Sequence, residues 1–135
     1  LIRCESYAAK LFAEHPDEVN LKKLYLLHKK MQGENVKLNY KVWLQMNDEF
    51  HELIYTNCGS GILKELIYHT RLRIYRFRIV ETDLKIIDLY NEQHSKILEA
   101  IHNGHGKLTE KLMIIHLKTA EKHRSKIFRD IGELL

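Results

Sequence analysis

The chain has 135 residues, and its 22 Lys and Arg against 18 Asp and Glu leave a formal net charge of +4. This length suits one domain with a hydrophobic core that needs neither disulfides nor metal to fold. The mild, scattered basic excess favours solvated helix faces over a nucleic-acid groove, and no run approaches the ~18 apolar residues of a membrane span.

Two cysteines, Cys4 and Cys58, are too few for a disulfide framework and form no Cys-x-x-Cys pair. No charged-then-apolar leader opens the chain. We therefore expect a soluble, cytoplasmic protein. The chain starts at Leu1, already in a helical pattern, which indicates a piece of a longer protein.

One proline and six glycines among abundant Leu, Ile, Lys and Glu predict an almost wholly helical chain. The predicted helices span 1–14, about 17–32, about 39–56, 62 to about 80, 83 to about 102, and about 107 to 129 or a little beyond. Six helices with short connections predict an all-α, mostly antiparallel bundle that forms a single domain over residues 1–135.

Local signals set these boundaries. His15 precedes Pro16, a position biased away from helix, and the acids after Pro16 favour a helix start. The Gly- and Ser-rich break 57–61 and the turn 103–106 separate further helices. Thr82 or Asp83 is the expected N-cap of the fifth helix.

One predicted helix carries polar side chains on its apolar stripe. Trp43, Asn47, Phe50, His51 and Ile54 fall at i, i+4, i+7, i+8 and i+11. The aromatic and aliphatic members indicate that this stripe faces the core. Asn47 and His51 are then buried one turn apart and need partners, because an unsatisfied buried polar group costs about 1–3 kcal/mol.

Two more of the nine histidines lie on apolar stripes. His94 shares a stripe with Ile97, Leu98 and Ile101, and His116 shares one with Leu108, Leu112, Ile115 and Thr119. The histidines expected to be exposed are His15, His28, His69, His102 and His105. Three different helices therefore each turn one imidazole toward the centre of the bundle.

These imidazoles have two interpretations. His51, His94 and His116 with an oxygen from Asn47 would form a metal site with open positions, of a kind that suits Zn, Ni, Cu or Fe. Alternatively, each imidazole is a core histidine with its own hydrogen-bond partner. The pattern of the residues leaves both open, and it contains no His-Glu-x-x-His of a metalloprotease helix.

The predicted fourth helix offers basic side chains. Arg71, Tyr75 and Arg78 lie at i, i+4 and i+7 on one side, whereas Arg73 and Arg76 point elsewhere. An inward Arg is a bidentate binder of carboxylate or phosphate. The alternative is that these arginines are all solvated.

Four segments resemble a known family. The stretches 47–51 (Asn-Asp-Glu-Phe-His), 92–101 (Glu-Gln-His-Ser-Lys-Ile-Leu-Glu-Ala-Ile) and 113–117 (Met-Ile-Ile-His-Leu) are similar in order and spacing to the effector-binding FCD domain of GntR-type transcription regulators, FadR subfamily. Residues 5–13 resemble the opening helix of that domain. The resemblance covers nearly the whole chain.

The resemblance implies a dimeric helical bundle that binds a small effector, usually a carboxylate metabolite. In many members an Asp and three His hold a divalent metal, and the matching positions are Asn47, His51, His94 and His116. Asn47 departs from the family pattern, which has Asp at this position. The expected affinity for Zn or Ni is lower, because the amide oxygen of Asn47 is neutral. The neighbouring Asp48 cannot replace it, since its side chain points about 100° away from that of Asn47 around the helix.

The resemblance also implies ligand contacts and a larger protein. Arg71 lies near a basic position of the family's fourth helix, and we add Tyr75 and Arg78 as weaker ligand-binding candidates. Ser60 stands where the family commonly has Asn. A winged helix-turn-helix that binds DNA would precede this domain.

We therefore expect a ligand-sensing domain of a bacterial transcription regulator and not an enzyme. A metal-dependent enzyme is the weakest alternative, since Glu49 and Glu52 lie off the stripe of His51 and offer no general base. A plain interaction or dimerisation bundle without metal is the stronger alternative.

Overall fold

A computed structural model describes residues 1–75 and 83–134, without the side chain of Tyr75. These residues form seven helices and no strand, which confirms the all-α class. The helices are α1 (Ile2–Glu14), α2 (Glu18–Met31), α3 (Glu34–Leu38), α4 (Tyr40–Thr56), α5 (Gly61–Tyr75), α6 (Leu84–His102) and α7 (Gly106–Leu134).

Side-chain caps start four of the helices, and in α5 the cap is Ser60, whose hydroxyl oxygen accepts from the backbone N–H of Leu63 at 3.3 Å. Asp17 accepts a hydrogen bond from the backbone N–H of Val19 at 2.9 Å, and Asn39 accepts from Val42 at 3.4 Å. Asp83 accepts from the backbone N–H of Ile86 at 2.9 Å and is the N-cap of α6. Each cap satisfies a backbone donor that the first helical turn leaves without a partner.

Two helix predictions differ from the structure. The helix α3 fills a stretch that we expected to be a connection, because five residues are too few to show a helical period and none of them is buried. The last helix, which we expected to end at Arg129 or a little beyond, runs to Leu134. The predicted continuation of the fourth helix toward residue 80 lies outside the described residues.

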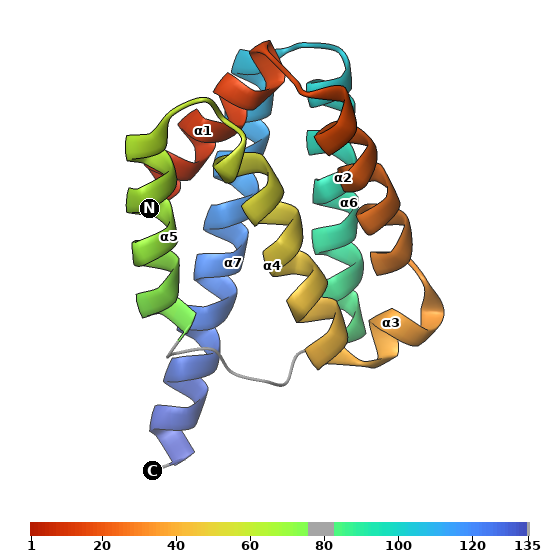
Figure 1. Cartoon of the computed structure of the whole chain (residues 1–135). Helices are drawn as coiled ribbons and strands as arrows, with labels where there is room; N and C mark the ends of the chain where they lie inside the picture. Colours follow the sequence, from red (N-terminus) through yellow and green to blue (C-terminus); the bar gives the residue numbers. More distant parts are fainter. Residues whose placement is uncertain (76–82, 135) are drawn as a thin grey trace.

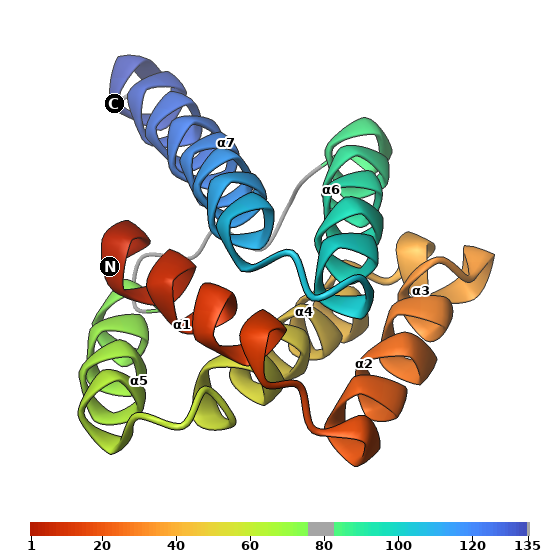
Figure 2. The same cartoon turned by 90° about the horizontal axis from the view of Figure 1, so that it is seen from above.

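The helices form a bundle in which α2, α4, α5, α6 and α7 alternate in direction along the chain (Figure 1). The first helix lies across this arrangement and packs against α4, α5, α6 and α7 (Figure 2). Residues on α1 can therefore reach groups on helices that are far away in the sequence.

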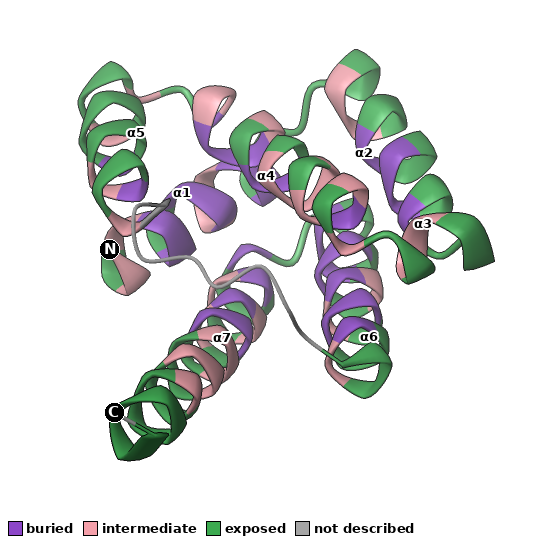
Figure 3. Ribbon diagram, turned by 90° about the horizontal axis from the view of Figure 1, so that it is seen from below, coloured by how far each residue is buried: buried purple, intermediate pink, exposed green. Residues whose placement is uncertain are grey.

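The core forms where the inner faces of the helices meet (Figure 3). Its largest fully buried side chains include Trp43, Phe12, Phe50, Leu24, Met31, Ile97, Ile101 and Met113. The predicted core stripes of the helices 39–56 and 83–102 are confirmed, since Trp43 and Ile54 and the neighbours of His94 on its stripe are buried. Within the described residues, none of the helices combines the length and apolar character of a membrane span.

The prediction that His116 is buried is confirmed, and Leu112 of its predicted stripe packs against the core, but two other members of that stripe were wrong. Leu108 and Ile115 are 44% and 46% exposed, and His116 instead shares the buried face of α7 with Thr109 and Met113. Both faces of α7 carry aliphatic residues, so periodicity could not choose between them. Packing against α1 and α6 selects the buried one.

His28 was also predicted wrongly as exposed. It is buried, and its Nε2 lies 2.7 Å from Ser95 Oγ. It follows Leu24 by one turn, and the core-facing side of α2 is wide enough to include it.

A buried histidine cluster as the candidate functional site

Three imidazoles from three helices meet in the core. His51 lies on α4, His94 on α6 and His116 on α7, and they are 2%, 0% and 3% exposed. The Nε2 atom of His116 lies 3.1 Å from Nε2 of His94 and 3.3 Å from Nε2 of His51. Each ring offers a ligand nitrogen, and these atoms all lie within 4.8 Å of one another.

A hydrogen-bond relay sets the tautomer of His116. Thr119 donates its hydroxyl proton to the carbonyl of Ile115 at 2.7 Å, so its oxygen is left to accept from the Gln93 amide N–H at 3.1 Å. The Gln93 carbonyl oxygen then lies 2.7 Å from His116 Nδ1 and accepts a hydrogen bond from its N–H. The lone pair of His116 therefore sits on Nε2, at the centre of the cluster.

A buried carboxylate holds the ring of His51. The Nδ1 atom of His51 lies 2.9 Å from Oε1 of Glu5, a residue on α1 that is 1% exposed. The same carboxylate accepts from both Nε and Nη2 of Arg71, a buried residue on α5. A carboxylate at this distance favours the proton of His51 on Nδ1, and its Nε2 then also directs a lone pair at the cluster.

His94 completes the cluster from the side of an aromatic wall. Its ring stacks on Phe50 with the ring centroids 4.2 Å apart and lies parallel to Trp43 at 6.3 Å. Its Nδ1 is buried without a hydrogen-bond partner among the described residues. The proton of His94 is therefore best placed on Nε2, where it can be donated to His116.

The electrostatics keep the imidazoles neutral. Burial, followed by the neighbouring histidines and Arg71, lowers the pKa of His94 and His116 well below 6.5. Burial and Arg71 also lower the pKa of His51, although Glu5 opposes them. For Glu5, burial disfavours the charged form, but Arg71 and His51 outweigh it and lower its pKa to about 2.

This arrangement fits a metal ion better than it fits protons. A single proton bridges His94 and His116, but His51 and His116 then face each other with two lone pairs across 3.3 Å. A tetrahedral ion with Zn–N bonds of about 2.0–2.1 Å needs nitrogens about 3.3–3.4 Å apart. The observed distances of 3.1 and 3.3 Å are close to that spacing. A metal needs neutral imidazoles with a lone pair directed at it. His51 and His116 offer theirs on Nε2, and His94 would offer its own once its proton moves from Nε2 to Nδ1.

The other predicted site residues have different outcomes. Asn47 lies one turn before His51 on α4 and is partly buried, but its role as a ligand stays a prediction. Arg71 points inward, as expected for a ligand-binding Arg, and is engaged by Glu5. The side chain of Tyr75 and all of Arg78 lie outside the described residues.

Two residues of the site were missed from the sequence. Glu5 precedes Ala8, Ala9 and Phe12 at spacings of three, four and seven, so its place on the buried stripe of α1 was readable. Gln93 left no such signal, because it is only partly buried and lies beside the stripe of His94.

Hollows in the surface lie around the cluster. A pocket of about 290 Å³ is lined by Arg71, by Leu117, which follows His116 in the chain, and by Arg3, Arg124 and Glu121. A second pocket of about 250 Å³ reaches Arg71 from the side of α4. Arg71 thus lines both of these pockets and, through Glu5, also contacts the buried cluster.

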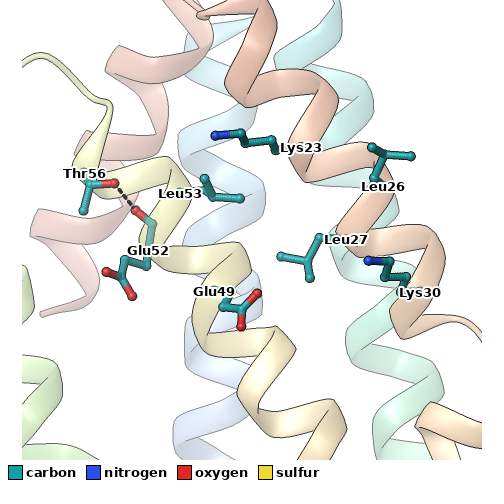
Figure 4. A pocket seen from close by; sticks show the side chains of 8 residues that line it. All are labelled: Lys23, Leu26, Leu27, Lys30, Glu49, Glu52, Leu53 and Thr56. Atoms are coloured by element: carbon teal, nitrogen blue, oxygen red, sulfur yellow. Dashed lines mark hydrogen bonds between the residues drawn. The ribbon is translucent and has the colours of Figure 1, made fainter.

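A wider groove of about 510 Å³ lies between α2 and α4, away from the histidines (Figure 4). Lys23 and Lys30 line one side, and Glu49 and Glu52 line the other. The two signs of charge balance, so this groove offers no preference for an anion.

The fold and the cluster define a helical domain with a buried three-histidine site. The family model of the FCD domain matches residues 3–119, and the chain belongs to the FCD domain family. This domain is the C-terminal effector-binding domain of GntR-family regulators, as the resemblance in sequence predicted. A search among curated proteins finds no match to the chain.

Proposed function

We propose that this chain is the ligand-sensing domain of a bacterial transcription regulator, with a divalent metal, Zn or Ni, held by His51, His94 and His116 and by Asn47. The convergence of three buried imidazoles carries the proposal: Nε2 of His116 lies at a spacing near that of a tetrahedral ion from Nε2 of both His94 and His51, and the ligand atoms of all three rings lie within 4.8 Å of one another. Two of the rings are held on Nδ1 by Glu5 and Gln93, as is usual for metal-ligating imidazoles.

A small carboxylate is the effector class that this site suits. A divalent ion supplies an open position to which a carboxylate oxygen can bind. The pocket of about 290 Å³ has three arginines, Arg3, Arg71 and Arg124, against one acid, Glu121, and apolar Leu117. The pocket on the other side of Arg71 is lined by Asp48, Glu49 and Glu52 and would repel an anion.

Effector binding would then regulate DNA binding by an attached domain. The site joins side chains from α1, α4, α5, α6 and α7, so a ligand that prefers one packing of these helices shifts their relative placement. We expect a winged helix-turn-helix upstream, a homodimer and a cytoplasmic location, because regulators of this family bind DNA in that form.

A regulatory role is favoured over catalysis. The FCD domain is a regulatory domain of transcription factors. The acid beside the cluster, Glu5, has a pKa of about 2 and is a poor general base, since an efficient base has a pKa near the working pH.

The test is elemental analysis of the chain, purified without an affinity tag or chelator, beside His94→Ala and the control His69→Ala. His69 is exposed on α5. We expect about one Zn or Ni per chain in the parent and the control, and none in His94→Ala. No metal in the parent, even after Zn and Ni are added back, would refute the metal site and favour a plain interaction bundle.

The carboxylate part is tested separately by calorimetric titration of the metal-loaded chain with a panel of mono-, di- and tricarboxylates. A pocket variant, Arg124→Glu, should weaken binding of the carboxylate that binds most tightly. The control Arg129→Glu makes the same charge change on an exposed part of α7. Equal binding by both variants would remove this pocket from the proposal.

A further inference from the structure

The proposed metal ligands carry no negative charge of their own. His51, His94 and His116 are neutral donors, and Asn47 offers an amide oxygen where the family pattern has a carboxylate. A divalent ion placed among neutral ligands in a buried site lacks the anionic compensation that desolvated charges require. A carboxylate outside the ligand set can supply it.

We infer that Glu5 is the positioning carboxylate of this metal site, acting through His51 and replacing the charge that Asn47 lacks. The inference rests on the proposed function. Glu5 comes from α1, whereas His51 comes from α4, and the contact of 2.9 Å between Nδ1 of His51 and Oε1 of Glu5 is buried. It orients the ring so that Nε2 faces the other two imidazoles.

The two outer partners of the cluster differ in charge. Gln93 holds His116 through a neutral amide, whereas Glu5 holds His51 through a carboxylate. Both fix the tautomer and the ring orientation, but only a carboxylate also raises the basicity of the imidazole and lowers the electrostatic cost of the cation. His51 is therefore the ligand whose strength depends most on its partner.

Arg71 determines how much of the negative charge of Glu5 is available to stabilise the metal ion. Its guanidinium shares the carboxylate of Glu5 through two donors, so part of the negative charge is already balanced. Removing Arg71 should leave Glu5 to compensate the metal alone and tighten metal binding. This opposite effect of the two partners distinguishes the inference from a general loss of structure.

The competing interpretation is that Glu5 serves only as the buried counterion of Arg71. Under that interpretation, Glu5→Gln lowers stability without changing metal affinity. Arg71→Met removes the need for a counterion, so adding Glu5→Gln in that background isolates the contact with His51. Glu14→Gln, an exposed acid on the same helix, is the charge-matched control.

The experiment measures Zn affinity by competition with a chromogenic chelator for the chain and for Glu5→Gln, Arg71→Met, the double variant and Glu14→Gln. Thermal unfolding of each metal-free variant is recorded alongside. We expect Glu5→Gln to weaken Zn binding about 10- to 100-fold, as is usual for an outer partner of a ligating His. The double variant should be weaker than Arg71→Met by a similar factor, and Glu14→Gln should match the parent.

Affinities of Glu5→Gln and the double variant within about twofold of their respective parents would overturn the inference and leave the metal site intact. Absence of Zn binding by the parent chain would overturn the metal site and the inference together. If Glu5→Gln does not fold, the comparison of the double variant with Arg71→Met decides.

Discussion

Protonation of single buried side chains should dominate the acid sensitivity of this protein. Burial lowers the pKa of His94 and His116 well below 6.5 in the folded chain, whereas unfolding restores the ordinary value. Below pH 6.5 the unfolded state therefore binds more protons than the folded state. The free energy of unfolding then decreases as the pH falls through that range.

We predict that the urea midpoint of the metal-free chain decreases between about pH 7 and pH 5. Glu5 adds a second loss at lower pH, because its pKa falls from 4.5 to about 2 on folding and its stabilisation disappears as the pH falls through that interval. Replacing His116 by Gln should reduce the first loss. A midpoint that stays constant over that first interval would contradict the buried, neutral state of the imidazoles.

Restoring a carboxylate at position 47 should strengthen the metal site. Asn47→Asp adds a charged oxygen one turn before His51, and we expect Zn affinity to rise about 10-fold or more, since an anionic oxygen binds a divalent cation better than an amide. Competition with a chelator measures this effect. Gln45→Glu adds the same charge on the exposed side of α4 and should have little effect. An equal gain in both variants would show general electrostatics and no direct ligand.

At the scale of the helices, one buried amide joins three elements. Asn91 of α6 accepts from the indole N–H of Trp43 on α4 at 3.1 Å and donates to the carbonyl of Met31 at the end of α2 at 3.0 Å. Both bonds are buried, and the same Trp43 forms part of the wall beside His94. The contact therefore fixes the position of α4 relative to α6, the helices that carry His51 and His94 of the cluster.

We predict that Asn91→Ala destabilises the fold by about 2–4 kcal/mol, because it leaves two buried polar groups without partners, each costing about 1–3 kcal/mol, and removes side-chain volume. Urea unfolding measures the loss. Asn20→Ala on α2 is the control, since Asn20 makes only an exposed contact with Asp17. A change for Asn91→Ala as small as that of the control would contradict the role of this amide.

At the scale of the whole molecule, a metal that binds only the folded chain should raise its stability. Saturation at about 100 times Kd adds about 2.7 kcal/mol to the free energy of unfolding. Because the proposed ligands lie on α4, α6 and α7, the gain requires the assembled bundle. No single helix could supply it.

We therefore predict that excess Zn raises the melting temperature of the chain by several degrees and that His94→Ala abolishes this rise. Differential scanning calorimetry with and without Zn measures the shift. His105→Ala, an exposed variant in the turn before α7, should retain it. An equal rise in His94→Ala would place the metal elsewhere.

Local chemistry in the sequence determined most of the helices and pointed to the three histidines of the proposed metal site. Capping by Asp17, Asn39 and Asp83 and the apolar stripe of Trp43, Phe50 and Ile54 depend on neighbours within a few residues. Such short-range effects are legible without a tertiary structure. The family motifs carried His51, His94 and His116, which the structure brings together.

Tertiary packing decided which face of α7 is buried and which residues surround the three histidines. Which aliphatic face of α7 is buried depends on α1 and α6, and no period in the sequence distinguishes the two faces. Glu5 joins the site only because α1 lies across α4 and α5, which places its carboxylate between Arg71 and His51. Contacts between residues that are 66 positions apart, as Glu5 and Arg71 are, arise from the way in which whole helices pack and leave no local signature in the chain.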